Sequence, residues 1–196
     1  MSIEHSVRPM HIEQRARRHI GAWLAGAAAC VFAFALPGCA SPRLGDYAAE
    51  KPTFDFRSYF DGRVLAHGMV SDRSGKVLRR FVATMQCSWV GDAGTLDEQF
   101  VYSDGERQHR VWRVQRLADG RYSAQADDVV GQAIGAQSGS AFNWRYTLRV
   151  PANGSVYELN FDDWMHLIDE RTVINRAVMS KFGLRVGEVT LSFSRP

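Results

Sequence analysis

The segment from Asp162 to His166, with sequence DDWMH, holds the residue types best suited to chemistry in this chain. On a helix, Asp162 and His166 would lie one turn apart and could share a metal ion. On a strand they lie about 13 Å apart, and Asp162 and Asp163 face opposite sides of the sheet. The strand interpretation therefore predicts no bound metal, no cofactor and no catalytic residue here.

Arg176 is the second candidate, because it lies among apolar residues in the segment TVINRAVMSKFG. On a strand it shares one face with Ile174 and Val178. Such an arginine could be buried and paired with Glu98 or Asp128. It could equally bind the carboxylate or phosphate head group of a ligand inside a barrel.

The elements that must position these residues are strands. Dipeptides typical of hairpin turns, such as Asp104-Gly105 and Asp119-Gly120, separate runs rich in Val, Phe, Tyr and Trp. Apolar and polar residues alternate from Phe142 to Val150 and again from Tyr157 to Asp162. The pattern predicts strands near residues 62–70, 76–90, 95–103, 107–117, 121–127, 141–150, 156–168, 170–180 and 185–194, with a short helix or turn near 126–137.

Eight or nine long antiparallel strands close into a barrel or fold into two packed sheets. Short turns between consecutive strands favour an all-β, up-and-down, lipocalin-like barrel, with a β-sandwich as the alternative. A barrel of this size can hold one small ligand. The chain has eleven Phe, six Tyr and five Trp. The candidate ligand-binding residues are Trp144, Trp164, His166 and Arg176.

The N-terminus has the layout of an export signal. Arginines 15, 17 and 18 precede a mostly apolar run over residues 20–36, which is shorter than the ~20 residues that span a bilayer. The following residues Leu36-Pro37-Gly38-Cys39 resemble a bacterial lipobox, which implies attachment of diacylglycerol at Cys39. Cys30, an uncleaved anchor and cleavage to a soluble product are the alternatives.

This interpretation divides the chain into a signal peptide (1–38), a lipidated N-terminus and tether (39–53) and a single β-barrel domain (54–196). Ala40 follows the cysteine where an inner-membrane retention signal would have Asp, so we expect the periplasmic face of the outer membrane. Cys87 would then be the remaining thiol, and its strand parity with Phe81 and Met85 predicts burial.

Charge excludes one class of partner. The net charge of the whole chain is +3, and no block of Lys or Arg occurs beyond the N-terminus. Nucleic acid is therefore not an expected partner. The expected contacts are a membrane, through the lipid anchor, and an acyl lipid; no feature identifies a protein partner.

Several runs beyond residue 60, among them FDGRVLAHGMVSDRSGKVLRRF and DDWMHLIDERTVINRAVMSKFG, resemble an uncharacterised proteobacterial lipoprotein family, the domain-of-unknown-function 3833 family. The resemblance covers most of the mature chain. It implies an envelope location and a single β-rich domain, and it implies no activity.

The sequence therefore favours a membrane-anchored periplasmic protein that binds or carries an acyl lipid or another apolar ligand. Two alternatives stay open. One is an enzyme acting on lipid or envelope substrates, and the other is an accessory subunit of an envelope complex.

Overall fold

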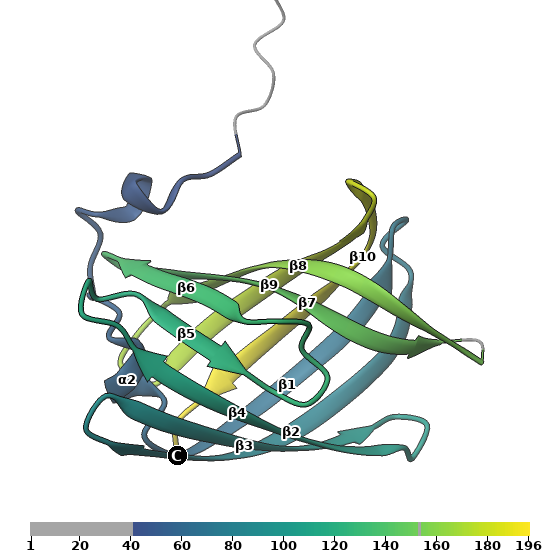
Figure 1. Ribbon diagram of the computed structural model, residues 1–196, viewed down its shortest axis with the longest axis horizontal. Coiled ribbons are helices and arrows are strands. Elements are labelled where there is room, and N and C mark those ends of the chain that lie inside the picture. Colours follow the sequence, from purple (N-terminus) through teal and green to yellow (C-terminus); the bar gives the residue numbers. More distant parts are fainter. Residues whose placement is uncertain (1–40, 153) are drawn as a thin grey trace, which may run out of the picture. The chain divides into compact units, whose positions relative to one another are not determined.

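Ten antiparallel strands close into a barrel in the computed structural model, which describes residues 41–152 and 154–196 (Figure 1). The strands are β1 (Gly62–Asp72), β2 (Val77–Val90), β3 (Ala93–Tyr102), β4 (Arg107–Arg116), β5 (Tyr122–Gln125), β6 (Ala133–Ser138), β7 (Ala141–Ala152), β8 (Ser155–Leu167), β9 (Thr172–Lys181) and β10 (Leu184–Ser194). Each strand pairs with its neighbours in sequence, and β1 also pairs with β10. Residues 42–196 form one compact unit with its own core.

The predicted all-β, antiparallel, up-and-down barrel is confirmed, and the sandwich alternative is wrong because the pairing of β1 with β10 closes the sheet. The expected number of eight or nine strands is also wrong. The missed strand is β6, where we expected a helix or turn. Its short run of small residues gives little strand signal, and Gly135 is required there. A Cβ on Gly135 would lie 2.0 Å from the Trp144 ring.

Alternation along the strands separates the core from the outer surface. On β2 the side chains of Phe81, Ala83, Met85 and Cys87 point inward and are buried, whereas those between them are exposed. Cys87 is therefore buried as predicted. Burial raises the pKa of its thiol to about 12, so the thiol is protonated and unreactive at neutral pH.

One end of the barrel is closed by the short helix α2 (Phe56–Tyr59) and its flanks. Phe54, Phe56, Tyr59 and Phe60 are all buried. The Phe56 ring stacks on Phe142 at a centroid distance of 4.4 Å. The Asp55 carboxylate caps the helix by accepting a hydrogen bond from the Ser58 amide at 2.8 Å. This plug makes the other end of the barrel the open one.

The segment before α2 lies against the barrel, which differs from the predicted tether over residues 39–53. A 3₁₀ helix, η1 (Leu44–Tyr47), contacts β6 and β7. The Phe54 amide donates to the Gly139 carbonyl at 2.7 Å. Residues 1–38 and Cys39, which carry the signal-peptide and lipidation predictions, lie outside the described residues. In the described part of the chain, no helix is both long and apolar enough to cross a membrane.

Candidate functional site

The interior of the barrel holds a cavity of about 1210 Å³. Its floor is formed by α2 residues and neighbouring aromatics such as Trp112 and Trp144. Its walls are inward-facing apolar side chains of every long strand, including Ala177, Leu148 and Phe161. Ligand sites commonly occupy roughly 300–1,000 Å³. The cavity is therefore large enough for a bulky ligand.

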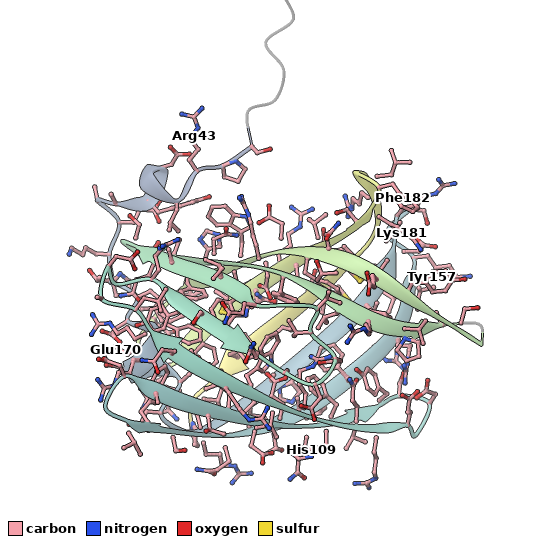
Figure 2. All side chains as sticks on the ribbon, viewed as in Figure 1. Arg43, His109, Tyr157, Glu170, Lys181 and Phe182 are labelled. Atoms are coloured by element: carbon pink, nitrogen blue, oxygen red, sulfur yellow. The ribbon has the colours of Figure 1, made fainter. Side chains whose placement is uncertain are left out.

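The cavity opens between four hairpin tips, which we call the mouth (residues 71–80, 101–108, 149–158 and 180–188). Residues from all four segments line the opening. In Figure 2, Tyr157, Lys181 and Phe182 gather at this end of the barrel, whereas Glu170 lies at the closed end. A ligand therefore has one route into the cavity that does not displace the α2 plug.

Arg110 is the buried cation of the cavity wall. It faces inward from β4, and its Nε and Nη2 donate to the Asp128 carboxylate at 2.8 to 3.2 Å. Its Nη1 lies 3.7 Å from Oε2 of Glu98 on β3. Burial lowers the pKa of Arg110, but the two carboxylates together hold it above its ordinary value. Arg110 is thus engaged by protein carboxylates and is not free to bind a ligand head group.

Two further carboxyl groups face the same interior. Oε2 of Glu98 is buried and has no hydrogen-bond partner among the described residues. Burial raises the pKa of Glu98 to about 7, although Arg110 opposes the rise. Burial also raises the pKa of Asp163 to about 6, although hydrogen bonds from Asn175 and from the Tyr146 hydroxyl, at 3.0 Å, stabilise its charge.

The charges in the wall therefore do not balance. The wall holds one cation, Arg110, and three carboxyl groups, and Asp128 already neutralises that cation. Glu98 and Asp163 add negative charge whenever they ionise. An anionic group placed at this depth would meet repulsion in a medium of low dielectric constant. The middle of the cavity consequently favours apolar, uncharged or hydrogen-bond-donating ligand groups.

Cations occur instead around the mouth. Arg107, Arg149 and Lys181 line the opening. Lys181 forms no ion pair with any described carboxylate, and its Nζ lies 4.5 Å from the centroid of the Tyr157 ring. The Nε of Arg149 lies 3.7 Å from Oε1 of Glu158. A ligand could therefore place an anionic head group at the mouth beside Lys181 and an apolar body inside.

The four candidate ligand-binding residues do not come together. Trp144 is buried and lines the cavity. Arg176 lies on the outer face of β9 with a side chain that is 59% exposed, and its Nε donates to Glu188 at 2.6 Å. The expectation that Arg176 points into the barrel is wrong, because β9 turns Asn175 and Ala177 inward instead.

Trp164 and His166 also lie on the outer face, where η1 covers them. Their rings stack at a centroid distance of 6.2 Å, and Tyr47 contacts His166 edge-on at 4.9 Å. Burial lowers the pKa of His166, which favours the neutral imidazole at neutral pH. Neither residue lines the cavity, so both have a packing role in this structure.

Asp162 and Asp163 point to opposite sides of β8, as the strand interpretation predicted. Asp162 pairs with Arg145 outside the barrel at 3.1 Å, whereas Asp163 lies inside. Residues 41–152 and 154–196 contain no group of three or more His, Cys, Asp or Glu side chains placed to hold a metal ion.

Sequence reasoning missed Arg110. It named Glu98 and Asp128 as partners of a buried arginine, but it assigned them to Arg176. Strand parity was the available signal, since Arg110 shares a face with the buried residues Trp112 and Val114. The irregular run over residues 107–116, with four arginines, obscured that signal.

Fold and cavity together define a closed antiparallel barrel with an internal ligand-sized site. The chain belongs to the DUF3833 family, described as "Protein of unknown function", whose model matches residues 33–195. None of the curated proteins matches the sequence.

A solved structure shares the fold at low identity. The S-type phycobiliprotein lyase CPES from Guillardia theta matches with a TM-score of 0.54 and 8% identity, over 79% of this chain and 98% of that one. A protein from Nitrosomonas europaea described as "a putative AttH" matches with a TM-score of 0.25 and 13% identity, over 81% of this chain and 55% of that one. The first match shows a common fold, and the second is too weak to support an argument.

Proposed function

We propose that this protein binds an acyl lipid, or a ligand of similar apolar character, inside a lipocalin-like barrel. The observation that carries the proposal is the cavity of about 1210 Å³, lined mainly by apolar side chains and open at one end. A packed core would not leave such a space, because protein interiors are normally filled to the density of organic crystals. The barrel fold that the chain shares with the phycobiliprotein lyase is consistent with use of the interior as a binding site.

The charge distribution favours one ligand orientation. The acyl chain lies in the deep, apolar part of the cavity, between the α2 plug and the wall around Ala177. A carboxylate or phosphate head group stays at the mouth with Lys181 and Arg107, because Glu98 and Asp163 disfavour an anion deeper inside. Arg176 cannot bind the head group in this orientation, because it lies on the outer face of β9.

The anchor and the location are further parts of the proposal. The lipobox-like residues Leu36 to Cys39 support attachment of diacylglycerol at Cys39, and Ala40 supports the periplasmic face of the outer membrane. On this proposal the membrane is both the anchor site and the source of the ligand. No protein partner is required.

Tryptophan fluorescence provides a direct test, since Trp112 and Trp144 line the cavity. Titration of residues 42–196 with a long-chain fatty acid should give a saturable change with a dissociation constant on the order of micromolar. Ala177→Phe should weaken this binding, because its ring occupies part of the deep cavity. Val178→Phe places the same ring on the opposite face of β9 and should bind normally. Absence of saturable binding by the folded wild type would refute the proposal.

One observation favours an enzyme as the second candidate. Glu98 and Asp163 are buried at the cavity wall with pKa values of about 7 and 6, and such carboxyl groups can exchange protons at neutral pH. Mass spectrometry of a bound lipid before and after incubation separates the two functions. A carrier releases its ligand unchanged, whereas an enzyme releases a lipid of altered mass.

A further inference from the structure

The mouth carries large apolar side chains that the fold leaves in solvent. Phe182 is 91% exposed, Leu184 is 73% exposed and Val156 is 65% exposed, and Leu78 is exposed on a third hairpin. We call these four residues the apolar rim. They lie on three separate hairpins, each of which borders the opening. Exposed apolar groups collected at a binding-site entrance indicate a surface that contacts something apolar.

Phe182 stands out because its backbone is unfavourable for its side chain. Phe182 has φ of 51°, and Gly183 follows with φ of 78°. Two successive residues in this region form the type of tight hairpin turn that favours Asn-Gly, since bulky side chains rarely adopt positive φ. The ring contributes little burial in return, because it is almost fully exposed. Apart from Lys181, whose Nζ lies 5.4 Å from the ring centroid, no contact among the described residues accounts for a phenylalanine at this position.

Basic residues accompany the apolar rim. The four mouth segments hold eight basic residues (Arg or Lys) and five acidic residues (Asp or Glu). The hairpins at the closed end (residues 89–94, 115–122, 138–141 and 167–172) hold three basic and four acidic residues. The short β5–β6 connection has two acidic residues, but Asp127 and Asp128 pair with Arg113 and Arg110 of β4. The positive charge of the domain is thus concentrated around the opening.

We propose that the mouth docks on the surface of an anionic lipid bilayer, with Phe182 and Leu184 entering the interfacial region and Lys181 and its neighbours contacting head groups. Aromatic rings and basic side chains both favour this boundary. The apolar rim is divided among separate hairpin tips, so it does not form the continuous packed face of a stable protein interface. This inference rests on the proposed function, because the bilayer would supply the ligand directly to the cavity.

Vesicle sedimentation tests the inference. Residues 42–196 lack the N-terminal segment, so any binding depends on the barrel. They should sediment with vesicles of phosphatidylcholine and phosphatidylglycerol, and binding should weaken at high salt and with phosphatidylcholine alone. Phe182→Asn should reduce binding at least about fivefold, because it removes an apolar side chain from the interface. Asparagine suits a positive φ, so this variant should melt no lower than the wild type.

A matched control comes from the closed end, where Val90 is 85% exposed on the β2–β3 hairpin. Val90→Asn should sediment with anionic vesicles as well as the wild type does. Equal binding by Phe182→Asn, or equal binding to both vesicle types, would overturn the inference. So would a concentration-dependent dimer that Phe182→Asn abolishes without any vesicle binding, since the occupant would then be a second copy of this chain.

The same variants separate this inference from the proposed function. Ala177→Phe should weaken fatty-acid binding and keep vesicle binding, because its ring narrows the deep cavity without altering the mouth. Phe182→Asn should keep fatty-acid binding in the absence of vesicles. Wild-type protein that binds fatty acid but does not bind anionic vesicles would contradict membrane docking and leave the proposed function standing.

Discussion

The Arg110 guanidinium and the Asp128 carboxylate form a bidentate ion pair inside the barrel wall, with N–O distances of 2.8 to 3.2 Å. The two residues come from β4 and from the connection between β5 and β6, so the pair fixes that connection against the barrel. Among the described residues, Arg110 is the only cation in the middle of the cavity wall, and Asp128 neutralises it. The pair therefore has a structural role and helps to exclude anions from the deep cavity.

Removal of Arg110 should destabilise the fold strongly. Arg110→Met leaves Asp128 and Glu98 without their cation, and the loss of one member of a buried ion pair costs about 3–5 kcal/mol. Arg176→Met is the control, since the Arg176 side chain is mostly exposed and Arg185 still pairs with Glu188, so the loss should be at most about 1 kcal/mol. Urea denaturation measures both changes in unfolding free energy. Equal, small losses in the two variants would contradict the assigned role of Arg110.

The acidic residues of the wall predict an unusual dependence of stability on pH. The pKa values of Glu98 and Asp163 rise from 4.5 and 3.8 to about 7 and about 6 in the folded protein. The folded state therefore binds more protons than the unfolded state between these values. The stability contributed by these groups is fully present at pH values below the pKa values of the unfolded state, 4.5 and 3.8, and is lost as the pH rises through 6 and 7. We expect the unfolding free energy to fall over this interval.

Glu98→Gln isolates the larger part of this effect. At pH 4 the variant should match the wild type, whose Glu98 is then largely protonated. At pH 8 it should be more stable by on the order of 3 kcal/mol, since it removes a buried charge. Asp97→Asn is the neighbouring control on the exposed face of β3, and it should show no such pH-dependent gain. A Glu98→Gln variant that is less stable than the wild type at pH 8 would refute the argument.

The sequence predicted the barrel more fully than the site. Alternation and hairpin dipeptides marked nine strands, and Gly135 with its small neighbours concealed β6. The face of Arg176 was ambiguous because apolar residues lie on both sides of β9: Ile174 and Val178 outside, Ala177 and Met179 inside. Parity within one strand cannot decide which face points inward. Only the pairing of all ten strands shows that Arg110, not Arg176, meets Glu98 and Asp128.

Lys181 should select ligands by their head group. Lys181→Met should weaken binding of a fatty acid several-fold and leave binding of the matching long-chain alcohol unchanged, because the lysine interacts only with the charged ligand. Arg176→Met should alter neither affinity. Tryptophan fluorescence titration with both ligands gives the comparison. Equal weakening for acid and alcohol would indicate damage to the cavity and would contradict a head group at the mouth.

Lipidation at Cys39 can be tested in cells. Metabolic labelling with an alkyne fatty acid should mark the wild-type protein, and Cys39→Ala should lose the label because the acceptor thiol is absent. Cys87→Ala is the control; its thiol is buried and should not affect labelling. Equal labelling of the wild type and Cys39→Ala would favour Cys30 or an uncleaved anchor.

The central claim is that the barrel interior holds an acyl lipid, and native mass spectrometry of protein extracted gently from membranes measures this most directly. We predict that the wild type and Val178→Phe carry an additional mass, released on denaturation and identified as an acyl lipid, and that Ala177→Phe carries less of it. Wild-type protein without any additional mass, or an equal amount of lipid on Ala177→Phe, would contradict the account.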